Sequence, residues 1–401
     1  MEEIAFWLSL ILKVFTVYFA CIAVFTLKKR RRYPKAAPAT RFAVVVAARN
    51  EEAVIGNLVE SVLNQNYPAH LRDIYVVPNN CTDYTEAAAV AAGAKIIHCL
   101  GNVKGKGDAL HHALGQLMRQ DYDAFVVFDA DNVLDRDFLA RMNDAFVSGA
   151  RVCKSRMMAA NPTQSGISGC YGLYFAAFDW SFNRPRAALG LSCKLVGTGF
   201  AVHREVLEAL GGWNTSTIAE DAEFSAQCAR LGYRVHWVYD ALTYDEAPTS
   251  FLLSLRQRKR WCSGVMQVAR QELGKLWEDY SPRPMLRWDM TMFLLAPFSQ
   301  AVSGILLGVN AALHLSSLLS MVPLVLLGLC LAYTGTAALG VALCLLGGYG
   351  LRGMGKTVLV LPIFMASWLP LQVISLFRDT KKWHAIQHTG RQMAADRKSV
   401  V

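Results

Sequence analysis

Apolar positions follow two different patterns along this chain of 401 residues, and the pattern changes near residue 285. In the first part, short runs of β-branched and aromatic residues alternate with segments in which apolar residues recur every three or four positions. The runs predict buried strands and the segments between them predict helices. The predicted strands are residues 42–47, 73–77, 95–97 and 124–128, and the predicted helices are residues 54–64, 85–92 and 108–119. This alternation indicates an α/β domain with a parallel sheet, which binds ligands beyond the carboxyl ends of its strands.

Three other stretches are apolar on every side. Residues 5–27 are interrupted only by Lys13, and residues 291–351 and 357–377 contain no Asp, Glu, Lys or Arg. At about 1.5 Å per residue, each stretch is long enough to cross a hydrocarbon layer of about 30 Å. Glu2 and Glu3 at the start, and a basic cluster after residue 27, do not fit a cleaved signal peptide. We therefore expect an uncleaved N-terminal transmembrane helix and a membrane-embedded C-terminal third.

The excess of basic residues lies beside these apolar stretches. The chain has 41 Lys and Arg against 31 Asp and Glu. Residues 28–35 hold six basic residues and no acidic one, and residues 378–401 hold six against two, so the rest of the chain is neutral on balance. A nucleic-acid-binding protein would spread this charge over a folded face, whereas basic clusters mark the cytoplasmic ends of membrane spans and attract anionic lipid. We expect an integral protein of the plasma (inner) membrane, with its N-terminus outside and its soluble domain in the cytoplasm.

These patterns divide the chain into five parts. They are an N-terminal transmembrane helix (1–27), a basic linker (28–40), a cytoplasmic soluble domain (41–284), C-terminal transmembrane or interfacial helices (285–378) and a basic tail (379–401). The domain and the tail share one side only if the chain crosses the membrane an even number of times between them, as four short spans or as two full spans with interfacial helices. The Gly-rich segment 347–350 and the prolines at 362 and 370 break the apolar runs. The ten Cys show no CxxC pair or zinc spacing, as expected of reduced cytoplasmic thiols.

Two segments carry residues suited to a metal and a phosphate. Asp129 and Asp131 follow a predicted strand, and alternate residues of an extended chain project the same way, so both carboxylates would face one Mn²⁺ or Mg²⁺ bridging a diphosphate. A strand-end turn helped by Asn132 explains this pair equally well on its own. Residues 104–108 open a helix where free amides and Lys106 can meet phosphate, although a plain helix start is the simpler explanation and the spacing of a P-loop is absent.

Two further motifs fit catalysis and acceptor binding. Glu220-Asp221 begins a helical stretch, where an acid is either a helix cap or a general base that removes a proton from an acceptor hydroxyl. Trp261 offers a flat face to a sugar ring, while Gln257 and Arg260, three residues apart, share a helix side and can hold a diphosphate. A basic helix lying at the membrane surface is the alternative.

In this order the motifs resemble the family 2 inverting glycosyltransferases, specifically the membrane-bound processive branch with the cellulose, chitin and hyaluronan synthases. The resemblance covers about residues 41–261 with the membrane segments around them. It rests on the motifs at residues 48–51, 105–110, 129–131, 197–199, 220–221 and 257–261. It implies a GT-A-like α/β domain with a mostly parallel sheet, which binds a nucleotide sugar and is embedded between transmembrane helices.

The resemblance also implies a role for each matching residue. Asp221 would be the catalytic base, and Asp131 with Asp129 would hold the divalent cation. The residues implied in nucleotide and donor binding are Ala48, Arg49, Glu51, Asn79, Asp83, Lys106, Asp129, Gln257 and Arg260. Those implied along the acceptor path are Gly197, Thr198, Gly199, Glu220 and Trp261. A single displacement would then convert an α-linked donor into a β-glycoside.

Two positions depart from the family pattern. Asn79 stands where the family carries an Asp, so its amide oxygen can accept a hydrogen bond from uracil but the charge is missing. Ala219 replaces a Thr before Glu220-Asp221, which leaves both carboxylates in place.

The sequence therefore predicts a membrane-bound processive inverting hexosyltransferase, which builds a β-linked polysaccharide from UDP-glucose or UDP-N-acetylglucosamine on a glycan or lipid-linked acceptor. The alternative within the same chemistry adds one sugar to a lipid. A phosphatase built on the Asp pair would leave residues 257–261 without a role. A membrane scaffold or channel would place ionisable residues inside its spans, and these spans hold almost none. The intact acids and Trp261 argue against an inactive relative, and the sequence carries no sign of the oligomeric state.

Overall fold

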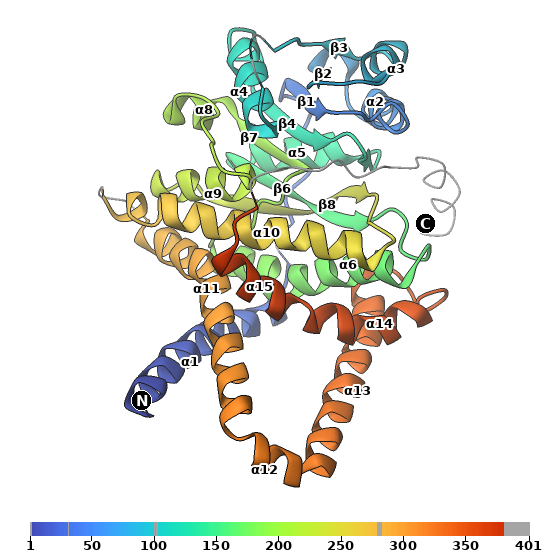
Figure 1. Ribbon diagram of the computed structural model, residues 1–401. Helices are drawn as coiled ribbons and strands as arrows, with labels where there is room; N and C mark the ends of the chain where they lie inside the picture. The colour runs from blue at the N-terminus through green and yellow to red at the C-terminus, as the bar shows by residue number, and fades with distance from the viewer. Residues whose placement is uncertain (1, 31, 100, 102, 279–282, 381–401) are drawn as a thin grey trace.

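The computed structural model describes residues 2–30, 32–99, 101, 103–278 and 283–380. It shows an α/β domain seated on a group of apolar helices (Figure 1). Most of the expected basic tail, from residue 381 onward, lies outside the described residues.

One mixed sheet of eight strands forms the centre of the domain. Its strand order is β3-β2-β1-β4-β7-β6-β8-β5. The strands are β1 (Phe42–Ala48), β2 (Arg72–Pro78), β3 (Lys95–Ile96), β4 (Ala124–Asp129), β5 (Val133–Leu134), β6 (Val152–Ala159), β7 (Phe200–His203) and β8 (Val235–Asp245). Neighbouring strands are parallel except where β7 joins β4 to β6 and where β5 pairs with β8. The prediction of a mostly parallel sheet is therefore confirmed.

Each face of the sheet is covered by its own hydrophobic core. Alternate residues of β1 point to opposite faces, so Val44 and Val46 pack on one side and Ala43 and Val45 on the other. The first face carries α2 (Ile55–Leu63), α3 (Thr85–Ala91) and α5 (Phe138–Val147). The second face carries α4 (Lys106–Leu117), α8 (Arg204–Leu210) and α9 (Glu220–Arg230). The four predicted strands and three predicted helices are all present, with ends shifted by two residues at most.

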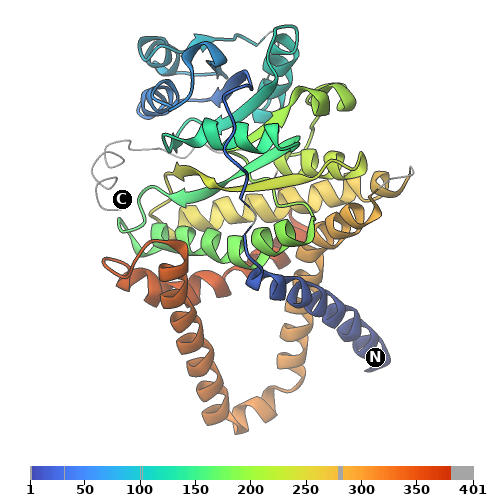
Figure 2. The same ribbon diagram turned by 180° about the vertical axis from the view of Figure 1, so that it is seen from behind.

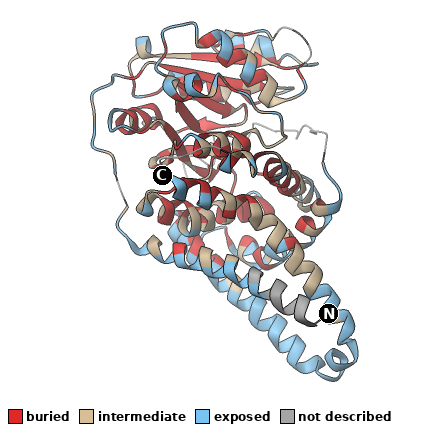
Figure 3. Cartoon of the chain, turned by 90° about the vertical axis from the view of Figure 1, so that its left-hand side faces the viewer, coloured by how far each residue is buried: buried red, intermediate tan, exposed pale blue. Residues whose placement is uncertain are grey.

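Apolar helices lie below the domain. They are α1 (Glu2–Val24) with the short η1 (Phe25–Leu27), α11 (Pro284–Leu313), α12 (Leu315–Ser320), α13 (Val322–Gly347), α14 (Gly355–Ala366) and α15 (Trp368–Phe377). Three segments of the described chain are long and apolar enough to span a membrane, namely Pro284–Leu313, Val322–Gly347 and Gly355–Phe377. Figure 1 shows α11 and α13 as an open hairpin that extends away from the domain, and Figure 3 shows that hairpin mostly exposed. Its apolar surface is unsuited to water, which makes membrane association plausible.

The helices α14 and α15 run across the base of the hairpin rather than along it (Figure 1). They pack on α6 (Gly166–Phe178) and α10 (Phe251–Glu272), which belong to the α/β domain. This arrangement is consistent with the second of the two expected topologies, two full spans with interfacial helices. The number of crossings stays a prediction.

A buried ion pair ties three helices together where the α/β domain meets the apolar helices. The guanidinium of Arg186, in α7 (Arg184–Leu189), donates two 2.9 Å hydrogen bonds to the carboxylate of Asp289 in α11. Tyr18 of α1 donates a third hydrogen bond, of 2.8 Å, to the same carboxylate. A buried charge is stable only when it is paired and hydrogen-bonded in this way, so the site fixes α1 and α11 against the domain.

The turn between α13 and α14 inserts into the domain. Tyr349 receives a 3.0 Å hydrogen bond from the backbone N–H of Ala159 at the end of β6. Its ring occupies the space beside Gly172 of α6, where an added Cβ would lie only 2.8 Å from the ring. Arg156 of β6 also donates to the carbonyl of Gly347. The Gly-rich segment that interrupts the apolar run is therefore a contact between the hairpin and the sheet.

Candidate functional site

Polar side chains gather beyond the carboxyl ends of β1, β2, β4 and β8. Asp129 is the last residue of β4, and Asp131 lies in the turn that follows, closed by a 3.2 Å hydrogen bond from the N–H of Asn132 to the carbonyl of Asp129. The expectation that an extended segment aligns the two carboxylates was therefore wrong, because the chain turns after Asp129. The turn nevertheless keeps both acids at one place, near Glu51 and Asp245.

Lys106 reaches the centre of this group from the first turn of α4. Its Nζ lies 2.5 Å from Oδ1 of Asp129 and 3.7 Å from Oε1 of Glu220, and it also donates to the carbonyl of Gly197. Burial alone would lower the pKa of Lys106, but the two carboxylates outweigh it and raise that pKa. Lys106 is thus a fixed cation among the acids, placed where a diphosphate would meet it.

The predicted nucleotide pocket lies at the ends of β1 and β2. Ala48 ends β1, and its carbonyl accepts a 2.8 Å hydrogen bond from the N–H of Asn79, which directly follows β2. Asp83 accepts hydrogen bonds from the hydroxyl and N–H of Thr85 and from the N–H of Glu52. Burial would raise the pKa of Asp83, but these hydrogen bonds lower it overall. Asp83 therefore orders this loop, and the half-buried Arg49 follows β1 at the same edge.

Glu51 lies between this pocket and the Asp pair. Burial, followed by the negative charges of Asp131, Asp129 and Asp83, raises the pKa of Glu51 to about 9. Its N–H donates to the hydroxyl of Thr85 at 2.8 Å. Glu51 therefore lies in a group of acids whose negative charge is only partly neutralised by nearby cations.

Asp221 lies in the first turn of α9, next to Glu220. The N–H of Gly197 donates to Oδ2 of Asp221 at 2.7 Å, and the N–H of Ala222 donates to Oδ1 at 2.8 Å. Glu220 precedes it, and burial, partly offset by Lys106, raises the pKa of Glu220 to about 7. The two acids therefore have different surroundings. Backbone amides orient the carboxylate of Asp221, whereas Glu220 is buried beside Lys106.

The segment Gly197-Thr198-Gly199 contacts both Asp221 and Asp129, the first acid of the Asp pair. Thr198 accepts a 2.9 Å hydrogen bond from the N–H of Asp129, and its hydroxyl donates to the side chain of Asn132. Gly199 has φ 63°, and an added Cβ would lie 2.5 Å from the hydroxyl of Ser155. Only glycine fits here without strain.

The helix α10 passes close to the start of α9, where an added Cβ on Gly264 would lie 2.7 Å from Ala219. Oε1 of Gln257 is buried and has no hydrogen-bond partner within the described part of the chain. Such a group is costly unless a ligand or water satisfies it. This observation suits the predicted contact between Gln257 and the donor, and Arg260 lies three residues further along the same half-buried side.

Trp261 lies within a group of aromatic rings rather than alone on the surface. The ring centroids of Tyr171, Tyr174, Phe175 and Trp368 lie 5.9 to 6.5 Å from its own. Arg258 docks the same helix, because its buried guanidinium donates to the carbonyl of Phe364 and the hydroxyl of Ser367. Part of this motif therefore holds α10 against α14 and α15.

The sequence pattern did not reveal two side chains at this site, Asp245 and Lys154. Asp245 ends β8 and accepts a 2.7 Å hydrogen bond from Asn132, which the sequence suggested only as a turn residue. Burial, with the charges of Asp131 and Asp129, raises the pKa of Asp245. Lys154 is buried within β6, and burial lowers its pKa to about 8. No local signal marks these residues, since the sheet brings them here from distant segments.

The acids at this edge fit a hard divalent cation. Carboxylate oxygens are the ligands that Mg²⁺ and Mn²⁺ prefer, and crowded carboxylates are stabilised when a cation offsets their charge. Within the described residues, no three His, Cys, Asp or Glu side chains are arranged as a metal site. Asp129 and Asp131 are the carboxylates that would hold such a cation.

Comparisons with known proteins agree with this geometry. The family model described as glycosyltransferase like family 2 matches residues 38–264. A probable glycosyltransferase of Bacillus subtilis is 28% identical over 270 residues, which are 64% of this chain and 62% of that protein. A β-monoglucosyldiacylglycerol synthase of Synechocystis is 28% identical over 277 residues, 65% of this chain and 55% of that protein. A putative cellulose synthase of Komagataeibacter xylinus is 24% identical over 320 residues, 74% of this chain and 20% of that protein.

The chain thus spans at most 62% of the length of these relatives. A solved structure of a mannosyltransferase from Pyrobaculum calidifontis, in complex with GDP-Man and Mn²⁺, superimposes with a TM-score of 0.63 at 20% identity. The match covers 94% of this chain and 99% of that one. This likeness confirms the expected GT-A-like fold.

Proposed function

This chain belongs to the glycosyltransferase-like family 2, and on that premise we propose that it is an inverting hexosyltransferase working at a membrane surface. It would transfer a hexose from a nucleotide sugar to an acceptor hydroxyl. The observation that carries the proposal is the convergence of Lys106, Asp129 and Asp221 around Gly197. One small space then offers a cation for phosphate, carboxylates for a metal and an oriented carboxylate for a proton.

In the proposed reaction, Asp221 removes the proton of the acceptor hydroxyl while its oxygen attacks the anomeric carbon. The bond from that carbon to the diphosphate oxygen breaks on the opposite face, so an α-linked donor gives a β-glycoside. A general base must be placed within hydrogen-bond reach of the proton. The N–H groups of Gly197 and Ala222 hold the carboxylate of Asp221 in one orientation for that task.

Other residues of this chain bind and orient the donor. Lys106, Gln257 and Arg260 would contact the diphosphate, and Ala48, Arg49, Glu51, Asn79 and Asp83 would line the nucleotide pocket. Asp131 and Asp129 would hold Mn²⁺ or Mg²⁺, which offsets the charge on the leaving diphosphate. We propose a uridine donor, UDP-glucose or UDP-N-acetylglucosamine, with Asn79 as the hydrogen-bond acceptor for uracil.

We propose that a single sugar is added to a lipid acceptor. Four aromatic rings surround Trp261, which leaves it less suited to holding a growing glycan. The helices α11 and α13 spread apart instead of lining a path for a polymer (Figure 1). The relatives that are glucosyldiacylglycerol synthases support the same choice.

A processive synthase of a β-linked polysaccharide, which the sequence favoured, is the second candidate. The observation that favours it is the unpartnered Gln257 on the same helix as Trp261, as the synthase resemblance requires. The cellulose synthases among the relatives support it as well. For both candidates we propose that the domain at residues 41–284 faces the cytoplasm and the N-terminus lies outside, in the plasma (inner) membrane.

The test uses the purified full-length protein in lipid nanodiscs with a panel of radiolabelled nucleotide sugars, with and without Mn²⁺. Transfer of one sugar to extractable lipid, sensitive only to β-glycosidase, is the expected result. A product of many sugars that remains at the origin of a thin-layer plate would replace the lipid acceptor by the processive reaction. Absence of sugar transfer from every donor would overturn the enzyme proposal.

A further inference from the structure

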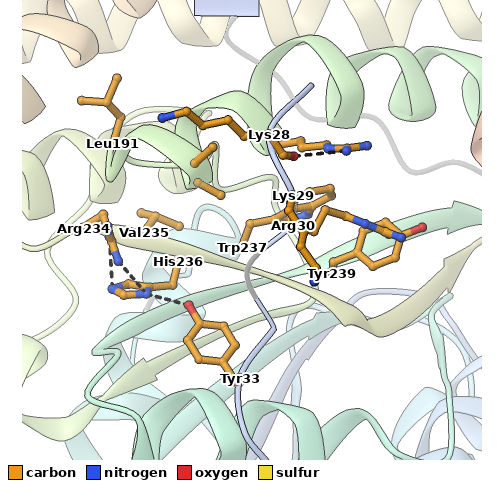
Figure 4. A pocket seen from close by; sticks show the side chains of 13 residues that line it. Lys28, Lys29, Arg30, Tyr33, Leu191, Arg234, Val235, His236, Trp237 and Tyr239 are labelled. Atoms are coloured by element: carbon orange, nitrogen blue, oxygen red, sulfur yellow. Dashed lines mark hydrogen bonds between the residues drawn. The ribbon is translucent and has the colours of Figure 1, made fainter. Parts of the chain in front are cut away.

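A pocket lies where the chain leaves α1, beside the start of β8 and at the opposite end of that strand from Asp245 (Figure 4). Its volume is about 490 Å³, including its open mouth. Its walls are formed by the chain segment after η1, by α7 and by the first half of β8. Figure 2 shows the segment after η1 running from α1 toward the sheet. The lining residues of β8 run from Val235 to Tyr239, whereas Asp245 ends that strand, so this pocket is separate from the candidate site.

The walls of this pocket are strongly basic. Five of its thirteen lining residues are Lys or Arg and none is Asp or Glu: the basic ones are Lys28, Lys29, Arg30, Arg184 and Arg234. Like charges this close repel one another unless an anion or a carboxylate offsets them. A smaller adjoining cavity does contain an acid, Asp179, but that carboxylate lies 3.8 Å from Arg156.

Arg184 shows that the positive charge is incompletely satisfied. Its Nη2 donates to the carbonyl of Lys28 at 3.3 Å, and its guanidinium lies 4.3 Å from the centre of the Trp180 ring. Its Nε is buried and has no hydrogen-bond partner in the described part of the chain. Burial, and then the charge of Arg30, lower the pKa of Arg184. A bound anion would accept the missing hydrogen bond and offset both charges.

Contacts within the protein hold the side chains that line this pocket in place. The guanidinium of Arg30 lies 3.8 Å from the centre of the Tyr239 ring, whose hydroxyl accepts a 2.9 Å hydrogen bond from Arg156. On the opposite wall, His236 is hydrogen-bonded to Tyr33 at 2.8 Å and to Arg234 (Figure 4). Cations held in place before a ligand arrives bind it with a smaller loss of side-chain entropy.

Exposed apolar side chains neighbour the lining residues along the chain. Val24 ends α1 and is 63% exposed, Leu27 precedes Lys28 and is 82% exposed, and Leu189 follows Ala188 and is 37% exposed. A free phosphate would leave these side chains in water, whereas the acyl chains of a lipid would cover them. The basic lining and these neighbouring apolar side chains together match a phospholipid.

We propose that this pocket binds the phosphate headgroup of an anionic phospholipid, with Arg30 and Arg184 as its principal ligands. The acyl chains run from the mouth along the end of α1. This site does not depend on the glycosyl acceptor or on the chemistry of the other site, because it lies at the opposite end of β8. Basic pockets beside membrane helices are suited to such headgroups.

The test is native mass spectrometry of the full-length protein in detergent, titrated with phosphatidylglycerol or phosphatidylcholine. We expect one phosphatidylglycerol per chain, bound at least roughly tenfold more tightly than phosphatidylcholine. Arg30→Gln combined with Arg184→Gln should remove this preference. The matched control is Arg32→Gln, which removes the same charge two residues from Arg30, from a side chain that is 72% exposed and lies outside the pocket.

Three outcomes would overturn the proposal: a preference that survives the double substitution, an equal loss in the Arg32→Gln control, or displacement of the lipid by millimolar inorganic phosphate. The last would assign the pocket to a soluble phosphate compound. Thermal unfolding of each variant monitors folding. If the double variant is unfolded, Arg30→Gln alone decides the test, because the guanidinium of Arg30 packs on the half-buried ring of Tyr239 and not in the hydrophobic core.

Discussion

The backbone N–H of Gly197 donates a 2.7 Å hydrogen bond to Oδ2 of Asp221. The carbonyl of the same glycine accepts a hydrogen bond from Lys106, whose Nζ contacts Asp129. One residue thus positions the proposed base and the proposed phosphate ligand relative to each other. A change at any of these residues should disturb transfer more than it disturbs the fold.

We expect Asp221→Asn to lower the rate of sugar transfer by roughly a thousandfold, since a general base contributes about 10²–10⁴. The amide has nearly the same shape, so nucleotide binding measured by calorimetry should persist. Asp240→Asn, which changes an acid that pairs with Arg32 away from the site, should leave the rate unchanged. Near-normal turnover by Asp221→Asn would exclude Asp221 as the base.

We expect Asp131→Ala to lower transfer by on the order of a hundredfold or more, because charge stabilisation on the leaving diphosphate is lost. The variant should also lose the Mn²⁺ signal that electron paramagnetic resonance detects in the wild-type protein. Asp121→Ala, at a side chain that is 98% exposed, is the control. Wild-type transfer that proceeds unchanged in a chelator would contradict the metal site.

Glu220 should make stability depend on pH. Burial raises its pKa from 4.5 to about 7 in the folded protein. Between these values the folded state holds a proton that the unfolded state has released, so stability falls as pH rises from 4.5 to about 7. Thermal unfolding of Glu220→Gln across this range should show a weaker fall than the wild type. Parallel curves for the two proteins would show that Glu220 does not titrate there.

Arg258→Ala should destabilise the protein by about 2–4 kcal/mol, because the carbonyl of Phe364 and two serine hydroxyls lose a buried charged donor. Thermal unfolding in detergent measures the effect. Arg256→Ala, on the exposed side of the same helix, should change stability by less than about 0.5 kcal/mol. Equal effects of the two substitutions would mean that Arg258 does not dock α10.

Gly199→Ala should cost about 1–3 kcal/mol, since φ is positive there and the new Cβ would meet Ser155. Gly115→Ala is the opposite case. It lies exposed in α4 with no atom within 4 Å of an added Cβ, so it should stabilise by about 0.5–1 kcal/mol. Denaturant unfolding measures the free energy of unfolding of both variants. An unchanged value for Gly199→Ala would show that a side chain at this position causes no strain.

The first half of the sheet could be predicted because each strand is a continuous apolar run. Val44, Val126 and their neighbours are buried on both faces and leave a pattern that chain-local analysis detects. It could also be predicted that the motif residues lie at one edge of the sheet, because parallel strands share their carboxyl ends. The sequence left the turn at Asp131 as one of two alternatives, since an Asp pair after a strand has the same spacing in a turn and in an extended chain.

The second half of the sheet could not be predicted, for a different physical reason. Lys154, Ser155 and Arg156 lie in β6, so this strand lacks an apolar pattern although it is central to the sheet. Asp245 acquires its place only when β8 pairs with β6 along its length. Likewise, Arg258 meets Phe364, 106 residues away. Such partners are set by tertiary packing, which leaves no signal in the neighbouring sequence.

The insertion of Tyr349 into the domain has a consequence for biosynthesis. The ribosome releases β6 and α6 long before the turn at residues 347–350, so the newly made domain carries an open notch beside Gly172 until the hairpin of α11 and α13 has been made. If this hairpin inserts into a bilayer, as we propose, completion of the α/β domain waits for that insertion. A finished form apart from the membrane would then not accumulate, because the last piece of its interior arrives with the hairpin.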